Sequence, residues 1–281
     1  MKKESFELLL GLTHKQPWLA SKAAQLHSVL FEECPCEQSR TLIFEMLDRF
    51  TYIDSKIHRL NIKDLALELA TEPGITSSDT QIVAMSADSN ADSSQEVIYH
   101  LKPEMESQGW RDHKVVNRFS HALKTYKESG HKNIILVDDF IGSGKTVIGR
   151  VTEIQRQFKH ASITDYSIRV KALTSTQQGL KNITDEGINV TAQRTLKKGI
   201  DDYYDAPQAQ LYREMMQAME SILSKMYNDR EMPSLGYNGA QATYCREESN
   251  TPNSVFPIFW WPFKTDGSER RTLLIRAMGD A

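Results

Sequence analysis

The chain has few cysteines and lacks a long apolar segment. Its 281 residues contain three cysteines, Cys34, Cys36 and Cys245, which are too few for a disulfide framework. A single residue separates Cys34 from Cys36, a spacing shorter than that of structural zinc sites, so no metal ion is expected there. There is no run of about 18 apolar residues, and Glu7 interrupts the first apolar stretch before it reaches the length of a secretory signal. We therefore expect a cytoplasmic protein without a membrane span.

The chain also lacks an excess of charge of one sign. Its formal net charge is −3, which gives no electrostatic reason to expect tight, non-specific binding to nucleic acid. Hydrophobic residues make up 40% of the chain and charged residues 25%, a balance typical of proteins that fold around a buried core.

The periodicity of apolar residues predicts three regions. In residues 1–75 apolar side chains recur every three or four positions, which predicts a helical layer that covers the sheet or docks a partner. In residues 76–205 short apolar strands alternate with helices, which predicts an α/β core with a doubly wound, mostly parallel sheet. Residues 206–281 are expected to form an amphipathic helix and then an irregular, aromatic-rich hood.

The segment that follows the apolar strand 133–138 has the residues of a phosphate site. Two carboxylates, Asp138 and Asp139, end the strand. The chain then enters a helix through Gly142, Ser143, Gly144, Lys145 and Thr146. Unpaired N–H groups at a helix start attract anions, and glycine lets the backbone approach a ligand closely. Two carboxylates would repel a phosphate unless hydroxyl groups lay between them, so a ribose 5-phosphate fits this segment.

Two other interpretations of the segment stay open. A Walker A loop of a P-loop NTPase needs glycine at position 139, where the chain has Asp139, so that match fails at its first glycine. The second interpretation is a tight strand-to-helix turn whose carboxylates are solvated or cap the helix. The pair of acids next to a loop with two glycines favours the ligand site.

The same segment resembles the signature of type I phosphoribosyltransferases, an apolar strand followed by two acidic residues and a [TS]-G-x-[TS] loop. Asp138 and Asp139 match the acids, and Ser143, Gly144 and Thr146 match the loop. The resemblance implies that the aspartates hold the 2- and 3-hydroxyls of ribose and that loop amides hold the 5-phosphate. It also implies Mg²⁺, held mainly through the pyrophosphate and ribose oxygens of phosphoribosyl diphosphate.

A second loop, 86–94, follows the apolar run 81–86. The resemblance implies that this loop binds pyrophosphate, although it has no glycine and its acids would repel phosphate unless they faced Mg²⁺. The candidate residues are Ser86, Asp88, Ser89 and Asn90. Related transferases often close a mobile basic loop over pyrophosphate. The alternative interpretation of the corresponding segment is a basic stretch that is only solvated. At that place the chain has Arg111, His113, Lys114 and Arg118.

The segment 250–260 resembles the ending of a phosphoribosyltransferase-like group found in bacterial conflict loci. Some members of that group accompany reverse transcriptases in retron antiphage systems, so the resemblance implies a reverse transcriptase–msDNA complex as a partner. Tyr237 and Trp260 are candidates to stack on a base whose edge Asn253 reads. Packing in a core or an interface is the alternative, because aromatic side chains serve both purposes.

Three functions are compatible with these features. The first is a nucleotide-depleting effector of a retron-type system, in which water or another acceptor takes the ribosyl group. The second is a metabolic phosphoribosyltransferase for a nucleobase, and the third is a sensor that binds phosphoribosyl diphosphate or a nucleotide without catalysis. A homo-oligomer is compatible with each of them, and no covalent nucleophile is expected.

Overall fold

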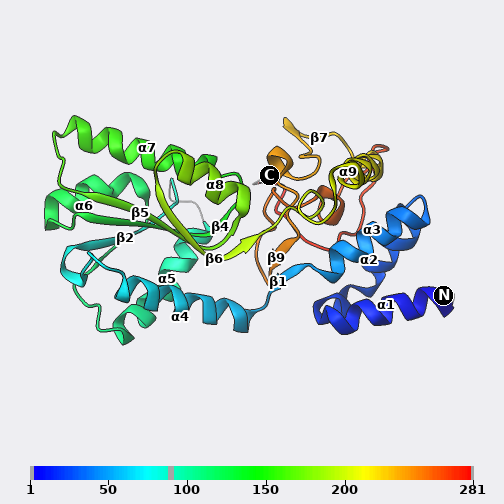
Figure 1. The fold of residues 1–281 in the computed structure, drawn as a ribbon, viewed down its shortest axis with the longest axis horizontal. Coiled ribbons are helices and arrows are strands. Elements are labelled where there is room, and N and C mark those ends of the chain that lie inside the picture. The colour runs from blue at the N-terminus through cyan, green and yellow to red at the C-terminus, as the bar shows by residue number, and fades with distance from the viewer. Residues whose placement is uncertain (1–2, 88–91, 280–281) are drawn as a thin grey trace. The chain divides into compact units, whose positions relative to one another are not determined.

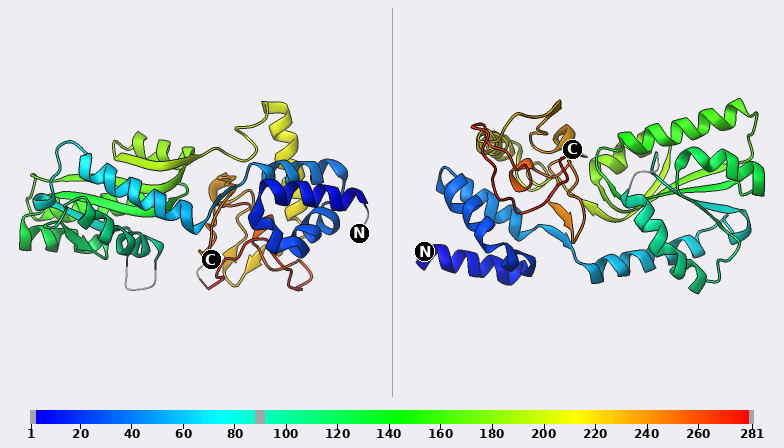
Figure 2. Two further views of the ribbon diagram at one scale, coloured as in Figure 1. Left: turned by 90° about the horizontal axis from the view of Figure 1, so that it is seen from below. Right: turned by 180° about the vertical axis from the view of Figure 1, so that it is seen from behind.

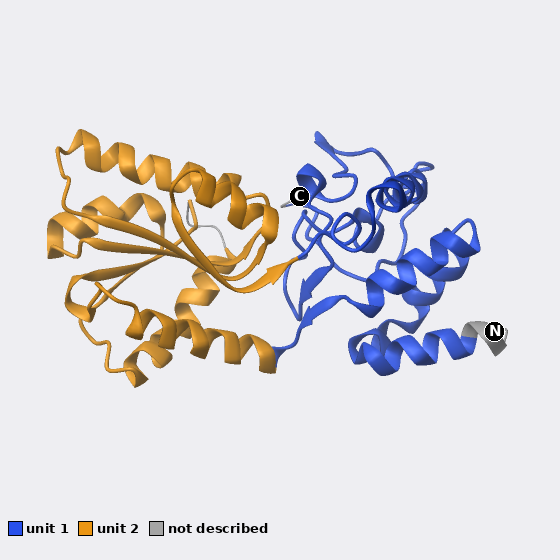
Figure 3. Ribbon diagram, viewed as in Figure 1, with its two compact units in different colours: residues 1–55, 197–281 blue, residues 56–196 orange. Residues whose placement is uncertain are grey.

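The computed structural model describes residues 3–87 and 92–279. Contacts between residues divide the chain into two compact units, which Figure 3 shows in different colours. Unit 1 consists of residues 1–55 and 197–281, and unit 2 consists of residues 56–196. Within the described residues, none of the helices is both long enough and apolar enough to cross a bilayer.

Unit 2 is built on a parallel sheet of five strands in the order β3-β2-β4-β5-β6. The strands are β2 (Thr80–Ala84), β3 (Lys114–Val116), β4 (Asn133–Ile141), β5 (Ser167–Thr176) and β6 (Asn189–Leu196). The helices are α4 (Ser55–Thr71), η3 (Ser77–Asp79), α5 (Ser93–Ser107), η4 (Phe119–His121), α6 (Ala122–Ser129), α7 (Lys145–His160) and α8 (Gln177–Asp185). The predicted α/β fold with a parallel sheet is therefore confirmed.

The central strand β4 is apolar on both faces because helices cover both sides of the sheet. Ile135 and Val137 pack in one core with residues of α4 and α5. Ile134 and Leu136 pack in a second core with residues of α6, α7 and α8. Alternate residues of a strand point to opposite faces, so this apolar run supports two helical layers. Figures 1 and 2 show α7 along one face and α4 along the other.

The strand order determines where a ligand fits. From β2 the chain crosses to β3 on one side, and it then returns to β4 on the other side. The carboxyl ends of β2 and β4 therefore form a topological switch point, where ligands bind in open parallel sheets. The parallel register aligns Ala84 with Val137 and Asp138 with Ala172. The loops that follow β2, β4 and β5 consequently meet at one edge of the sheet.

Unit 1 combines short N-terminal helices with a largely irregular C-terminal segment. Its helices are α1 (Lys3–Lys15), η1 (Pro17–Lys22), α2 (Ala23–Ser28), η2 (Val29–Glu33), α3 (Glu37–Asp48), α9 (Ala206–Glu220), η5 (Tyr237–Gly239) and η6 (Pro257–Phe259). Two strand pairs are present, parallel β1 (Thr51–Ile53) with β9 (Tyr244–Arg246), and antiparallel β7 (Met226–Tyr227) with β8 (Arg230–Glu231). Phe50 packs edge-on against Phe259, with 5.8 Å between ring centroids. Segments from both ends of the chain thus share one core.

The structure groups the chain differently from the three consecutive regions 1–75, 76–205 and 206–281. Residues 56–71 belong to unit 2, because Leu65 and Leu69 of α4 pack in the core under the sheet. Residues 1–55 belong with the C-terminal segment, because β1 pairs with β9. Strand β1 has three residues, which are too few for a periodic pattern to reveal it.

Candidate functional site

The acidic pair lies on β4, which continues to Ile141 and so extends beyond the predicted strand end. The main-chain amide of Asp139 donates to Oδ1 of Asp138 at 2.9 Å. Ser93, the first residue of α5, donates from its Oγ to Oδ1 of Asp139 at 2.5 Å. The segment after β2 and the acidic end of β4 therefore meet at the switch point.

A third carboxylate, that of Asp92, lies beside the pair. Asp92 caps α5 by accepting from the amide of Ser94 at 2.8 Å and from the Ser94 hydroxyl. Burial raises the pKa of Asp138 well above its ordinary value, and the charges of Asp139 and Asp92 raise it further. Like charges that face one another in a partly dry site reduce stability, and a cation or hydroxyl donors between them relieve that repulsion.

The loop between β4 and α7 directs amide groups away from the protein interior. Thr176 Oγ1 donates to the carbonyl of Gly142 at 2.7 Å, and Asn182 Nδ2 donates to the carbonyl of Ser143 at 3.0 Å. In a trans peptide the N–H points opposite to the C=O, so the amides of Ser143 and Gly144 point away from α8. Amides in the first turn of α7 have no acceptor within the helix and carry partial positive charge. This arrangement suits a phosphate group.

Two glycines allow this loop to lie directly against α8. Gly144 has a φ of +80°, and a Cβ on it would lie 2.9 Å from the Gly179 carbonyl oxygen and 2.9 Å from Cγ1 of Ile183. A Cβ on Gly179 would lie 2.2 Å from the carbonyl oxygen of Gly142. A larger residue at either position would therefore displace the loop from α8.

The predicted phosphate-binding residues are contiguous at the end of β4 in the structure. Gly142 to Gly144 form the loop, and Lys145 and Thr146 open α7 with exposed side chains. Their positions fit the expected phosphate cradle, and their contacts with a ligand stay a prediction.

Several residues at this site were not identified from the sequence. Ser93 reaches the acidic pair, and the segment Asp-Ser-Ser at 92–94 carries the signal of a helix N-cap. Asp92 differs from these residues, because it is one of the acids of the loop 86–94 that were expected to repel phosphate unless they faced Mg²⁺. Thr176 and Asn182 anchor a loop that precedes them by 34 and 39 residues. No local sequence pattern links segments so far apart, and these contacts follow from the order of the strands.

The loop predicted to bind pyrophosphate is described in part. Ser86 is buried, and Asp88, Ser89 and Asn90 lie outside the described residues. The amide of Ser86 donates to Ser94 Oγ at 3.1 Å, and Gln95 Nε2 donates to Ser86 Oγ at 3.3 Å. Ser86 thus ties the start of the loop to the first turn of α5, and its contact with pyrophosphate stays a prediction.

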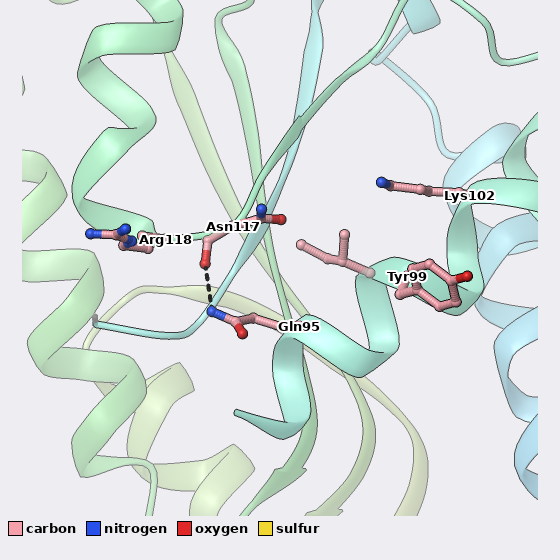
Figure 4. A pocket seen from close by; sticks show the side chains of 6 residues that line it. Gln95, Tyr99, Lys102, Asn117 and Arg118 are labelled. Carbon is pink, nitrogen blue, oxygen red and sulfur yellow. Dashed lines mark hydrogen bonds between the residues drawn. The ribbon is translucent and has the colours of Figure 1, made fainter. Parts of the chain in front are cut away.

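A pocket of about 370 Å³ lies beside the first turns of α5 (Figure 4). Its lining consists of Gln95, Ile98, Tyr99, Lys102, Asn117 and Arg118. Gln95 Nε2 donates to the main-chain carbonyl of Asn117 at 3.3 Å, which joins α5 to the segment after β3. Lys102 and Arg118 make the lining basic, so the pocket suits an anion.

The segment predicted to carry a mobile basic loop contains strand β3. Arg118, which follows this strand, lines the pocket. Arg111 pairs with Glu106 at 2.8 Å, both with exposed side chains, and Lys114 begins β3 itself. Burial lowers the pKa of His113. Of these four basic residues, Arg118 is therefore the one that the structure places at the pocket.

The residues predicted to bind a base, Tyr237, Asn253 and Trp260, belong to unit 1. Trp260 is 1% exposed, and its Nε1 donates to the carbonyl of Val255 at 2.9 Å. The indole of Trp260 is packed inside unit 1, so it does not offer the exposed stacking surface that the sequence predicted. Tyr237 is 41% exposed, and its amide donates to the carbonyl of Asn253 at 2.9 Å. Aromatic composition could not distinguish these two environments.

Comparison with solved structures finds distant likenesses. An orotate phosphoribosyltransferase from Aeropyrum pernix is 13% identical, with 50% of this chain and 72% of that chain covered and a TM-score of 0.34. A hypothetical protein from Neisseria gonorrhoeae with bound ppGpp is 13% identical, with 60% and 97% covered and a TM-score of 0.37. A xanthine-guanine-hypoxanthine phosphoribosyltransferase from Helicobacter pylori is 12% identical, with 52% and 84% covered and a TM-score of 0.29.

Comparison with sequences and families is more specific. No curated protein sequence matches the chain. The family model described as PRTase-CE matches residues 32–276, a range that includes the acidic pair, the loop before α7 and most of both units. The match spans well over half of the 281 residues. The chain therefore belongs to the PRTase-CE family and is a phosphoribosyltransferase-like protein.

Proposed function

We propose that unit 2 binds phosphoribosyl diphosphate, or a nucleotide through its 5-phosphate, and transfers the ribosyl group. The observation that carries this proposal is the acidic pair of β4 directly before a loop that points amides outward at the switch point. The amides of 143–146 would hold the 5-phosphate. Asp138 and Asp139 would accept hydrogen bonds from the ribose hydroxyls, which separate the carboxylates from the phosphate.

The described residues also offer a place for pyrophosphate. Lys102 and Arg118 line a pocket to which Gln95 also contributes. The side chain of Gln95 donates a hydrogen bond to Ser86, which begins the loop after β2. In ribosyl transfer the sugar develops positive charge at C1, and the leaving pyrophosphate gains negative charge. Carboxylates at the ribose and cations at the pyrophosphate stabilise the two developing charges from opposite sides. Fixing both groups on rigid elements also lowers the entropic part of the barrier.

The donor set at the site fits Mg²⁺. Asp92, Asp138 and Asp139 offer hard carboxylate oxygens. The pKa of Asp138 is raised by burial and then by repulsion from Asp139 and Asp92, and a divalent cation would relieve that repulsion. We propose that these residues complete a coordination shell supplied mainly by the ligand's oxygens. Bound Mg²⁺ would neutralise charge on the pyrophosphate. Ser93 positions Asp139 for this role through its hydroxyl.

The biological setting that we propose is a nucleotide-depleting effector of a retron-type antiphage system, acting in the cytoplasm. The resemblance of segment 250–260 to proteins of conflict loci supports it. In this setting water accepts the ribosyl group, and a reverse transcriptase–msDNA complex restrains the protein until infection. A metabolic enzyme would instead transfer the group to a nucleobase, and a sensor would bind without turnover.

The first experiment tests the ribose–phosphate site by hydrogen exchange of unit 2 with phosphoribosyl diphosphate and Mg²⁺. A ligand at 100 times its Kd stabilises the folded state by about 2.7 kcal/mol. We expect this protection in the parent and its loss in Asp138→Asn/Asp139→Asn. Asp165→Asn is the matched control, because Asp165 is an exposed carboxylate of the same unit that pairs with Lys132. Protection that survives in the double variant, whether phosphoribosyl diphosphate or ATP is the ligand, would overturn the proposal.

A second experiment separates the three functions by their products. The purified chain is incubated with phosphoribosyl diphosphate, or with nucleotides, and small molecules are resolved by chromatography. Release of ribose 5-phosphate or free base without an acceptor supports the effector. Turnover that requires an added base supports the metabolic enzyme, and protection without turnover supports the sensor. The same assay with a co-purified reverse transcriptase–msDNA complex measures restraint, and light scattering measures the oligomeric state.

A further inference from the structure

Two helices of unit 2 bring together a second set of polar side chains that the ribose–phosphate site does not use. His58 lies on α4, and Glu96 and His100 lie one turn apart on α5. One ligand atom from each residue lies within 4.8 Å of the other two. His58 Nε2 is 3.9 Å from Glu96 Oε1, and His100 Nδ1 is 4.0 Å from the same oxygen.

The chemistry of this set is that of a transition-metal site. Two imidazoles and one carboxylate are the ligands of open zinc sites and of other sites that leave coordination positions free. Zinc–ligand bonds of about 2.0–2.2 Å place tetrahedral ligands roughly 3.3–3.5 Å apart. The separations of 3.9 and 4.0 Å exceed that range by roughly half an ångström. Small side-chain rotations on two packed helices are enough to close such a difference.

Burial distinguishes this set from an ordinary surface ion pair. His58 is 6% exposed, and transferring a charged imidazolium out of water is unfavourable. A buried imidazole whose position is set by packing is a preorganised ligand for a metal ion. Glu96 and His100 have side chains that are 38% and 46% exposed, so an ion can enter from solvent. One ligand is therefore fixed by packing, and two remain accessible.

We infer that His58, Glu96 and His100 form a binding site for a divalent transition-metal ion of the zinc class. The site is separate from the aspartates that suit Mg²⁺, because imidazole nitrogen favours zinc and similar ions, whereas carboxylate oxygen favours magnesium. A bound ion would clamp α4 to α5. Since α5 begins at Ser93, which bonds to Asp139, the clamp would also steady one wall of the site at the switch point.

The test measures Zn²⁺ binding to the full, untagged and metal-free chain by competition with a chromophoric chelator. The Cys36→Ser background removes an exposed thiol whose pKa is lowered by hydrogen bonding with Ser39. We expect one Zn²⁺ per chain. His100→Ala and Glu96→Gln should each lower the affinity for Zn²⁺ by at least about 100-fold, because loss of a direct ligand costs more than loss of a residue that only hydrogen-bonds to a ligand. His160→Ala is the control, because His160 is an exposed histidine in the last turn of α7.

Spectroscopy gives a second measurement that does not depend on stability. Substitution by Co²⁺ should give visible absorption bands of a four- or five-coordinate ion, and X-ray absorption should show a nitrogen and oxygen shell at about 2.0–2.1 Å. Both signals should disappear in His100→Ala, which alters an exposed side chain and leaves the core intact. Absence of stoichiometric Zn²⁺ binding, or equal affinity in the parent, His100→Ala and Glu96→Gln, would overturn the inference.

Discussion

The Arg270–Glu33 pair of unit 1 and the acidic pair of unit 2 arrange their charges differently. In unit 1 the buried Arg270 donates from Nε to the buried Glu33 at 2.9 Å, and opposite charges meet. In unit 2 burial raises the pKa of Asp138, and the like charges of Asp139 and Asp92 raise it further. The first arrangement is complete within the chain, whereas the second is one that a ligand or a cation would relieve.

The difference distinguishes polar groups that support a fold from polar groups that serve a site. A satisfied buried network stabilises one conformation, so removing a partner lowers stability. A cluster of like charges lowers stability in the free protein, so removing a member raises stability and abolishes binding. Substitution of Arg270 in unit 1 and of Asp138 in unit 2 should therefore change stability in opposite directions.

The largest effect is expected for Arg270→Met in unit 1. Arg270 also donates to the carbonyls of Ile258 and Trp261, so its loss leaves Glu33 buried without its main partner. Breaking a buried pair in this way lowers the free energy of unfolding by about 3–5 kcal/mol. Urea unfolding followed by hydrogen exchange of unit 1 measures the change. The double variant Glu33→Leu/Arg270→Met is the control and should recover most of the loss. A cost below about 1 kcal/mol would contradict the role assigned to the pair.

The second effect is a pH dependence of unit 1 that arises from Glu220. Burial raises the pKa of Glu220 to about 7, although Ser234 and Leu235 donate to its carboxylate. In the unfolded chain the group ionises near its ordinary value of 4.5. Protonated Glu220 therefore stabilises folded unit 1 fully below pH 4.5, and this stabilisation is lost as the pH rises to about 7.

We expect Glu220→Gln to raise the free energy of unfolding of unit 1 at pH 8 by about 3 kcal/mol, because the pKa rises from 4.5 to about 7 and each pKa unit corresponds to about 1.4 kcal/mol. The gain should vanish near pH 4, roughly the unfolded pKa of a glutamate. Glu214→Gln, at an exposed position of the same helix, should change stability little at either pH. An equal gain at both pH values would show that burial of the charge is not the cause.

Much of unit 2 could be predicted because local pattern and tertiary position agree there. The apolar residues 134–137 form a strand buried on both faces, as a continuous apolar run indicates. The acidic pair and the loop with Gly142 and Gly144 lie at the end of that strand, as expected. The alternation of strands and helices was enough to predict the parallel sheet.

The remaining features depend on contacts between distant segments. Ser93 and Asp139 are separated by 46 residues, and strand order alone brings them together. His58 and Glu96 lie on different helices, so their sequence spacing carries no metal signature. In unit 1 an aromatic-rich segment could be a surface or a core, and Trp260 proves to be buried. Sequence periodicity reports which residues are buried locally but not which segments they pack against.

The third effect tests whether the loop before α7 needs glycine. Gly144→Ala places a Cβ against Gly179 and Ile183 at a positive φ, which costs about 1–3 kcal/mol in strain. We also expect weaker protection by phosphoribosyl diphosphate, because the displaced loop no longer aligns its amides. Gly149→Ala in α7 is the matched control, since nothing lies within 4 Å of its Cβ. That variant should be more stable by about 0.5–1 kcal/mol. Unchanged protection in Gly144→Ala would argue against the phosphate cradle.

The smallest and most discriminating effect concerns Asp138→Asn in the absence of ligand. The pKa of Asp138 is raised in the folded protein, so its favourable contribution is present below the unfolded pKa of about 3.9 and is lost as the pH rises through the folded pKa. Asparagine cannot ionise and lacks this loss. The variant should therefore match the parent near pH 4 and exceed it by on the order of 1 kcal/mol near pH 8.

Ligand should reverse this order, and that reversal separates a binding site from a strained structural turn. With Mg²⁺ and phosphoribosyl diphosphate the parent should gain about 2.7 kcal/mol at 100 times the Kd, whereas Asp138→Asn should gain much less. Hydrogen exchange of β4 at pH 8, with and without ligand, measures both values. If Asp138 merely capped a turn, Asp138→Asn would lower stability in the absence of ligand, and ligand would protect both proteins equally. If Asp138→Asn is more stable than the parent without ligand and less stable than the parent with ligand, the like charges at the end of β4 serve ligand binding at a cost in stability.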